Sequence, residues 1–139
     1  MARYLIVANQ TLCGDQLADR VQKLMTEGPC TFHVVVPATY TKDHAVHIDG
    51  AAHAVAGKRL EAALERFRAL GADVTGEVGD ASPMLAVRDC FVASNTYDAV
   101  IVSTLPPGAS RWLRQDLPHR LERNYGLPVL QVTGVYERV

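Results

Sequence analysis

A loop rich in hydroxyl and guanidinium groups follows one of the most apolar stretches of the sequence. That stretch, from Ala99 to Val102, has the β-branched content of a strand buried on both faces. In open parallel sheets, ligands bind beyond the carboxyl ends of such strands. Arginine supplies bidentate donors and loop amides supply more, so the loop can hold an anion. Its candidate binding residues are Ser103, Thr104, Gly108, Ser110, Arg111, Arg114 and Asp116. The alternative is a proline-stiffened loop whose arginines are solvated or paired with carboxylates.

A second polar loop follows the apolar run at residues 3–9. The carboxyl ends of parallel strands meet at one edge of a sheet, so this loop should border the same site. Its candidate binding residues are Asn9, Gln10 and Thr11. Val36, at the end of another apolar run, is a fourth candidate. Cys13 lies in this loop, but no histidine base can be placed beside it, so no catalytic residue is predicted.

Histidines and cysteines offer a second kind of chemistry. His44, His47 and His53 have the spacing His-x2-His-x5-His, which suggests either a metal site or a mobile polar loop. The loop is favoured, because nothing nearby promises rigid support or second partners for the rings. The cysteines lie far apart without CxxC spacing, which indicates free thiols rather than a disulfide or zinc framework: Cys13, Cys30 and Cys90. The sequence therefore predicts no metal.

Hydrophobic periodicity predicts the elements that must position these residues. Strands are expected at residues 3–9, 31–36, 73–78, 99–103 and 129–132. Helices are expected at residues 15–25, 51–70, 82–95 and 116–124. Gly71 suits the C′ position of the second helix, and Ser82 followed by Pro83 suits the start of the third. The glycine in the third strand indicates a shorter strand near an edge.

Five strands alternating with four helices predict an α/β fold in a single domain, residues 1–139. We expect a doubly wound parallel sheet in the order 3-2-1-4-5, with helices on both faces. The 139 residues are 48% apolar and 21% charged, with a net charge of −1. This balance argues against nucleic acid as a partner, and the apolar runs are too short for a signal segment or a membrane span. A cytoplasmic location is expected.

Five segments also resemble a known family. They are Leu5-Ile-Val-Ala-Asn-Gln-Thr11, Phe32-His-Val-Val-Val-Pro37, Glu77-Val-Gly-Asp-Ala-Ser-Pro83, Tyr97-Asp-Ala-Val-Ile-Val-Ser103 and Gly126-Leu-Pro-Val-Leu-Gln-Val132. In this order they resemble, over nearly the whole chain, the strand ends and helix entry of the universal stress protein (UspA-like) family. The resemblance implies the adenine nucleotide alpha hydrolase-like fold and a site at the ends of the first and fourth strands.

The loop departs from the Gly-x2-Gly-x9-Gly-Ser/Thr pattern of nucleotide-binding members of that family. Ser103 stands at the first glycine, Pro106 or Pro107 at the second, Gln115 at the third and Asp116 at the hydroxyl residue. Prolines remove amide donors, and a carboxylate repels a triphosphate. Asn9 replaces the aspartate that meets the adenine edge, although its amide can both donate and accept. We therefore expect the family's site with weak or absent ATP binding.

The resemblance implies a non-enzymatic regulatory or ligand-binding module of the stress response. Its ligand would be an adenine nucleotide or another small anion, and no cofactor is firmly assigned. A homodimer is expected through the last strand, from Val129 to Val132, because edge pairing satisfies exposed backbone groups. The alternative is a nucleotide hydrolase or transferase that clamps phosphate with the loop arginines. Such an enzyme needs a base or a metal-binding carboxylate, for which only Asp15 and Asp116 are near.

Overall fold

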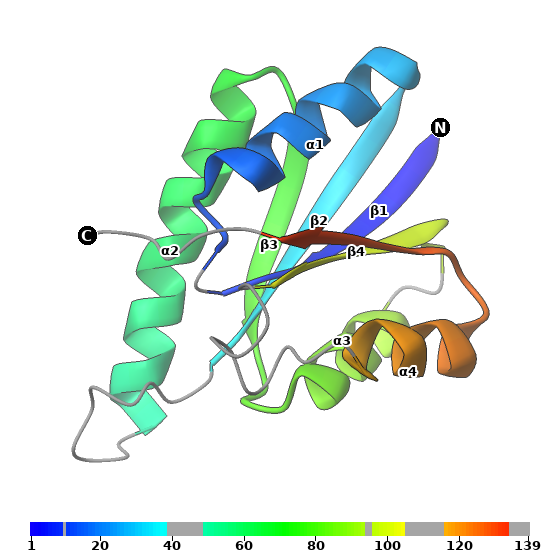
Figure 1. The fold of residues 1–139 in the computed structure, drawn as a ribbon. Coiled ribbons are helices and arrows are strands. Elements are labelled where there is room, and N and C mark those ends of the chain that lie inside the picture. The colour runs from blue at the N-terminus through cyan, green and yellow to red at the C-terminus, as the bar shows by residue number, and fades with distance from the viewer. Residues whose placement is uncertain (10, 39–48, 94–95, 105–115, 134–139) are drawn as a thin grey trace.

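The computed structural model is a five-stranded parallel sheet flanked by helices (Figure 1). It describes residues 1–9, 11–38, 49–93, 96–104 and 116–133. The strands are β1 (Ala2–Val7), β2 (Cys30–Pro37), β3 (Asp73–Gly79), β4 (Ala99–Thr104) and β5 (Val129–Thr133). The helices are α1 (Asp15–Glu27), α2 (Asp49–Ala69), α3 (Pro83–Ala93) and α4 (Asp116–Tyr125). The observed order β3-β2-β1-β4-β5 confirms the predicted fold.

The predictions for β1 and β3 need correction, whereas the bounds of β2, β4 and β5 differ from the predicted ones by at most one residue at each end. β1 ends at Val7 rather than at residue 9, because the chain turns there and the Leu12 N–H donates to the Asn9 carbonyl at 3.1 Å. β3 lies at an edge as predicted, but its seven residues make it no shorter than β1, which has six. Gly76 in β3 therefore marks a close approach of α2 rather than a weak strand, since a Cβ there would lie 2.5 Å from Leu60 Cδ1.

The helices cover the sheet in two layers, α1 and α2 on one face and α3 and α4 on the other (Figure 1). Successive side chains of a strand point to opposite faces, so each inner strand contributes to both cores. Ile6 and Val34 pack in the core under α1 and α2, whereas Leu5 and Val35 pack in the core under α3 and α4. Among the helices in the described ranges, none combines the length and apolar character needed to cross a membrane.

Helix ends are fixed by the residues that the sequence indicated. After α2, the Ala72 N–H donates to the Phe67 carbonyl and the Gly71 N–H donates to the Arg68 carbonyl, both at 3.0 Å. This is a Schellman motif, and its C′ residue Gly71 has φ +94°, which favours glycine. At the start of α3, Ser82 Oγ accepts a long 3.5 Å hydrogen bond from the Leu85 N–H. Both predicted caps are confirmed.

Candidate functional site

Four buried polar residues meet where β1 and β4 end. Their exposed fractions are at most 2%, and they are Asn9, Thr11, Ser103 and Thr104. Thr11 Oγ1 and Ser103 Oγ share a hydrogen bond of 2.5 Å, which joins the loop after β1 to the end of β4. Thr104 Oγ1 accepts a 3.3 Å hydrogen bond from Gln131 Nε2 of β5. The loop after β1 and the end of β4, which the sequence predicted to share a site, therefore lie together at the carboxyl ends of the strands.

The amide of Asn9 is held by the protein itself. Its Nδ2 donates to the Pro37 carbonyl at 2.7 Å, and its Oδ1 accepts from Arg59 Nη1 at 2.6 Å. Asn9 thus connects the ends of β1 and β2 to α2. The contact also brings a guanidinium to this site that sequence reasoning missed, because Arg59 lies fifty residues away within an ordinary helical pattern.

A second arginine of α2 holds the same loop. Arg66 Nη1 donates to the Cys13 carbonyl at 2.6 Å, and Arg66 Nη2 forms a 2.6 Å ion pair with Asp15 Oδ1. Asp15 has an 81% exposed side chain, so its carboxylate lies on the surface and outside the buried polar cluster. The Cys13 thiol donates to the Arg59 carbonyl at 3.5 Å. These contacts hold the first loop against α2.

The remaining predicted residues are placed as follows. Val36 is fully buried in the core under α1 and α2, where its side chain packs against apolar neighbours. Asp116 is the first residue of α4. Five predicted binding residues lie outside the described ranges, so their role stays a prediction: Gln10, Gly108, Ser110, Arg111 and Arg114. Of the spaced histidines, His44 and His47 also lie outside these ranges, and His53 is exposed on α2.

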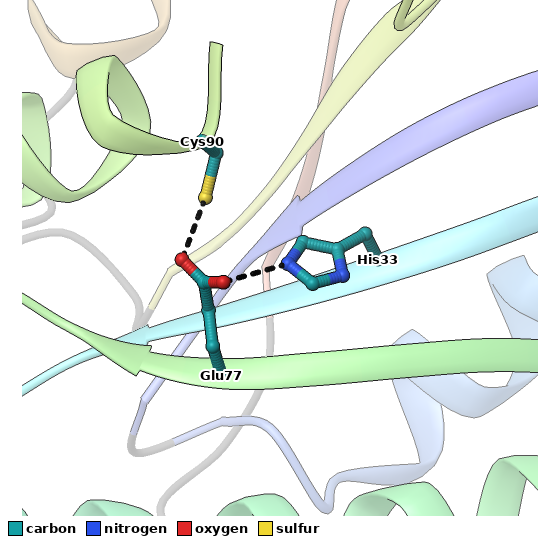
Figure 2. A group of neighbouring side chains, drawn as sticks. All are labelled: His33, Glu77 and Cys90. Carbon is teal, nitrogen blue, oxygen red and sulfur yellow. Dashed lines mark hydrogen bonds and ion pairs between the residues drawn. The ribbon is translucent and has the colours of Figure 1, made fainter. Parts of the chain in front are cut away.

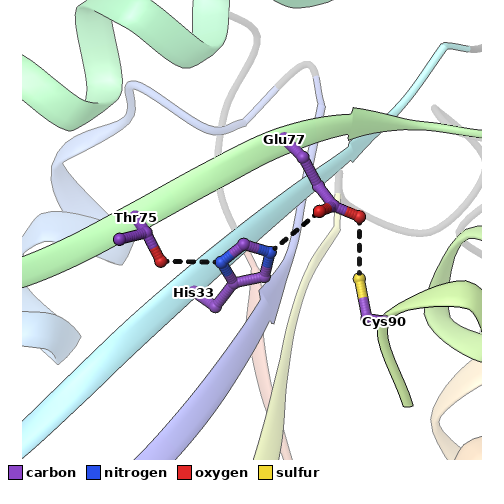
Figure 3. Close-up of polar contacts among 4 residues, drawn as sticks. All are labelled: His33, Thr75, Glu77 and Cys90. Atoms are coloured by element: carbon purple, nitrogen blue, oxygen red, sulfur yellow. Dashed lines mark hydrogen bonds and ion pairs between the residues drawn. The ribbon is translucent and has the colours of Figure 1, made fainter. Parts of the chain in front are cut away.

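A second polar cluster lies on the face of the sheet that α3 and α4 cover, where α3 packs against β2 and β3. His33 and Thr75 are register neighbours on these strands, and Glu77 follows two residues along on the same face (Figure 3). His33 Nδ1 lies 2.7 Å from Thr75 Oγ1, and His33 Nε2 lies 3.4 Å from Glu77 Oε2. The Cys90 thiol of α3 donates to Glu77 Oε1 at 3.4 Å (Figure 2).

Burial sets the charge state of the cysteine in this cluster. Cys90 is 2% exposed, and burial raises the pKa of its thiol to about 12, with the Glu77 carboxylate acting in the same direction. Without a bound cation the thiol is therefore protonated near neutral pH and serves as the donor to Glu77. Sequence reasoning missed this cluster because its members are 44 and 13 residues apart and match no short motif.

A cavity of about 300 Å³ adjoins this cluster on the side of the amino-terminal ends of the strands. His33, Thr75 and Tyr97 line it, together with Arg3 and Asp73. The Arg3 guanidinium lies 5.2 Å from the centre of the Tyr97 ring, within the range of a cation–π contact. Polar and aromatic side chains thus line the cavity together, and it lies at the opposite end of the sheet from Asn9 and Ser103.

The chain is similar to known proteins in its fold, but comparisons of its sequence find no match. No protein-family model matches the chain, and a search of the curated proteins gives no match either. Among solved structures, a universal stress protein in complex with cAMP matches with a TM-score of 0.60 and 16% identity, over 94% of this chain and 96% of that one. A universal stress protein from Archaeoglobus fulgidus matches with a TM-score of 0.56 and 12% identity, over 95% and 93%. The chain therefore has the fold of the universal stress proteins, the adenine nucleotide alpha hydrolase-like arrangement of one five-stranded parallel sheet.

Proposed function

We propose that this chain is a divergent universal stress protein that binds a small ligand where β1 and β4 end. The observation that carries the proposal is the buried polar cluster at this place, in which Thr11 and Ser103 join the two strand ends. In the sheet, β1 lies between β2 and β4, so the chain continues from β1 to one side and later returns to the other side. This reversal of direction is the switch point at which open α/β sheets bind ligands.

An adenine nucleotide with few phosphates is the ligand class that this site suits best. One protein of the same fold was solved with cAMP, which supports an adenine ligand for this chain. The loop after β4 has prolines at 106 and 107 and a carboxylate at Asp116, in place of the glycine and hydroxyl residues that cradle a triphosphate. The carboxylate of Asp116 and the amide donors lost at the two prolines disfavour the binding of ATP more than that of a monophosphate, because ATP carries more charge and more phosphates.

Calorimetric titration of the purified chain with ATP, ADP, AMP and cAMP tests this proposal. We expect AMP or cAMP to bind more tightly than ATP, for the reasons of charge and lost donors. Arg111→Ala should weaken binding by ~10-fold, the worth of one hydrogen bond to a charged group. Asp116→Ser should strengthen ATP binding because it removes a repelling carboxylate.

The matched control is Arg120→Ala, since Arg120 is an exposed arginine of α4 outside the loop. This variant should bind each nucleotide as the native chain does. Micromolar ATP affinity of the native chain, with no preference for fewer phosphates, would contradict the proposal. So would the absence of any nucleotide binding.

We also propose that the protein is a homodimer joined through β5. This strand forms one edge of the sheet, and an edge presents backbone N–H and C=O groups that a second copy can pair with. Light scattering at micromolar concentration should give twice the mass of the 15.1 kDa chain. A monomeric mass at that concentration would exclude the dimer without affecting the proposed ligand site.

A further inference from the structure

We propose that His33, Glu77 and Cys90 form a site for a borderline-soft divalent cation, for which Zn²⁺ is the natural probe. The three residues come from β2, β3 and α3, and each offers one donor atom within 4.8 Å of the other two. Figure 2 shows the Glu77 carboxylate between the imidazole of His33 and the thiol of Cys90. An imidazole nitrogen, a carboxylate oxygen and a thiolate sulfur are the donor types that zinc takes in proteins. This site lies on the face of the sheet opposite to α1 and α2, apart from the proposed nucleotide site.

The separations of the donor atoms are close to those of tetrahedral coordination. Nε2 of His33 and Sγ of Cys90 each lie 3.4 Å from an oxygen of Glu77, and one donor atom from each residue lies within 4.8 Å of the other two. Zinc bonds of ~2.0–2.3 Å at tetrahedral angles place ligand atoms ~3.3–3.8 Å apart. The two 3.4 Å separations are to different oxygens of Glu77, Oε2 for His33 and Oε1 for Cys90, so one edge has the required length whichever oxygen binds the ion. The remaining edges are at most 4.8 Å, and they shorten if the half-exposed Glu77 carboxylate turns and the His33 and Cys90 side chains move toward each other.

Thr75 supports the imidazole as an outer partner does in zinc sites. Its hydroxyl lies 2.7 Å from His33 Nδ1, on the far side of the ring from Glu77 (Figure 3). When Nδ1 carries the proton and donates to Thr75 Oγ1, the lone pair of Nε2 is directed toward Glu77 and Cys90. A lone pair facing a carboxylate is unfavourable, and a cation between them removes that repulsion. The hydroxyl can also donate to Nδ1, so the cluster is stable without metal.

Charge and access are also suited to a divalent cation. Binding exchanges the thiol proton of Cys90, which goes to solvent, for a sulfur–metal bond. The thiolate and the Glu77 carboxylate then supply two negative charges that neutralise the two positive charges of the ion, which matters beside a buried group. The Glu77 side chain is 47% exposed and the cavity of about 300 Å³ lies beside His33, so an ion can enter. Three protein ligands leave the fourth position to water.

Cobalt substitution tests the site directly, because a thiolate bound to Co²⁺ gives a sulfur-to-metal charge-transfer band and tetrahedral Co²⁺ gives intense visible bands. The chain is freed of metal with a chelator under reducing conditions, titrated with Co²⁺ and then displaced with Zn²⁺. We expect one Co²⁺ per chain with both spectral features. Cys90→Ser should abolish the charge-transfer band. Glu77→Gln and His33→Gln should each weaken binding by more than the ~10–100-fold that loss of an outer partner costs.

Matched variants separate this site from others in the chain. Cys30→Ser removes a half-buried cysteine outside the cluster and should leave the spectrum and affinity unchanged, as should His47→Ala. Thr75→Val should keep the charge-transfer band and weaken binding by about 10-fold. Far-ultraviolet circular dichroism and urea unfolding show whether each variant is folded; Glu77→Gln, at a half-exposed position, provides a folded variant if Cys90→Ser does not. Binding without a thiolate band, a band that survives Cys90→Ser, or native affinity in Glu77→Gln and His33→Gln would overturn the proposal.

Discussion

Replacing Gly79 with alanine is expected to lower the free energy of unfolding by ~1–3 kcal/mol, the usual cost of overpacking a core. Gly79 ends β3 directly beneath α3. A Cβ built there would lie 2.8 Å from Ala86 Cβ and 2.9 Å from Val35 Cγ2. Both neighbours are fully buried, and neither has a flexible side-chain end that could move aside. The helix must therefore shift away from the sheet to admit one methyl group. Urea denaturation of the native chain and the variant measures the loss.

Gly57→Ala is the matched control for this substitution. Gly57 lies inside α2, where a Cβ would meet no atom within 4 Å. Alanine has the higher helix propensity, so this variant should be more stable than the native chain by ~0.5–1 kcal/mol. If the two glycine variants instead change stability by the same amount and in the same direction, α3 does not approach β3 as closely as the structure shows.

Ser103→Ala is expected to cost ~1–3 kcal/mol, because it leaves the buried Thr11 hydroxyl without its partner in β4. The two hydroxyls are 2.5 Å apart and at most 2% exposed, so water does not readily replace the lost contact. Thr11→Val should cost a similar amount. The double variant should be less destabilised than the sum of the single variants, because no buried hydroxyl of the pair is then left unsatisfied.

Urea unfolding of the native chain, both single variants and the double variant completes this thermodynamic cycle. Thr133→Val is the control, since Thr133 is an exposed hydroxyl residue at the end of β5 and should change stability by less than ~0.5 kcal/mol. Additive effects of Thr11→Val and Ser103→Ala would show that the two hydroxyls do not depend on each other. The link between the first loop and β4 would then have to come from other contacts.

Most of the fold could be predicted because its determinants are local. Runs such as Val34-Val-Val36 and Val100-Ile-Val102 are apolar at successive positions, as strands covered on both faces require. The ends of α2 and α3 depend on Gly71 and Ser82, whose preferences for αL and N-cap positions are intrinsic. The strand order then follows from short, right-handed connections. The predicted extent of β1 was wrong, because Ala8 is an apolar residue before a turn and resembles the continuation of a strand.

The sites were less predictable because their contacts join distant positions. The meeting of Thr11 with Ser103 could be expected from strand polarity, since both follow buried strands. The hydrogen bond from Arg59 to Asn9 depends on how α2 is rotated over the sheet, which periodicity fixes only roughly. The cluster of His33, Glu77 and Cys90 requires the register of β2 with β3 and the placement of α3 together, and no spacing in one sequence contains that information.

The order of the strands also has a consequence during synthesis on the ribosome. The first 79 residues supply three adjacent strands, β3-β2-β1, and both helices of one face. The opposite face of these strands presents Leu5, Val7 and Val35, which stay uncovered until the residues of α3 and α4 emerge. At ~5–20 residues per second, the chain from Gly79 to Tyr125 takes roughly 2–9 s to be made. During that interval the nascent chain carries an apolar sheet face that a chaperone can recognise.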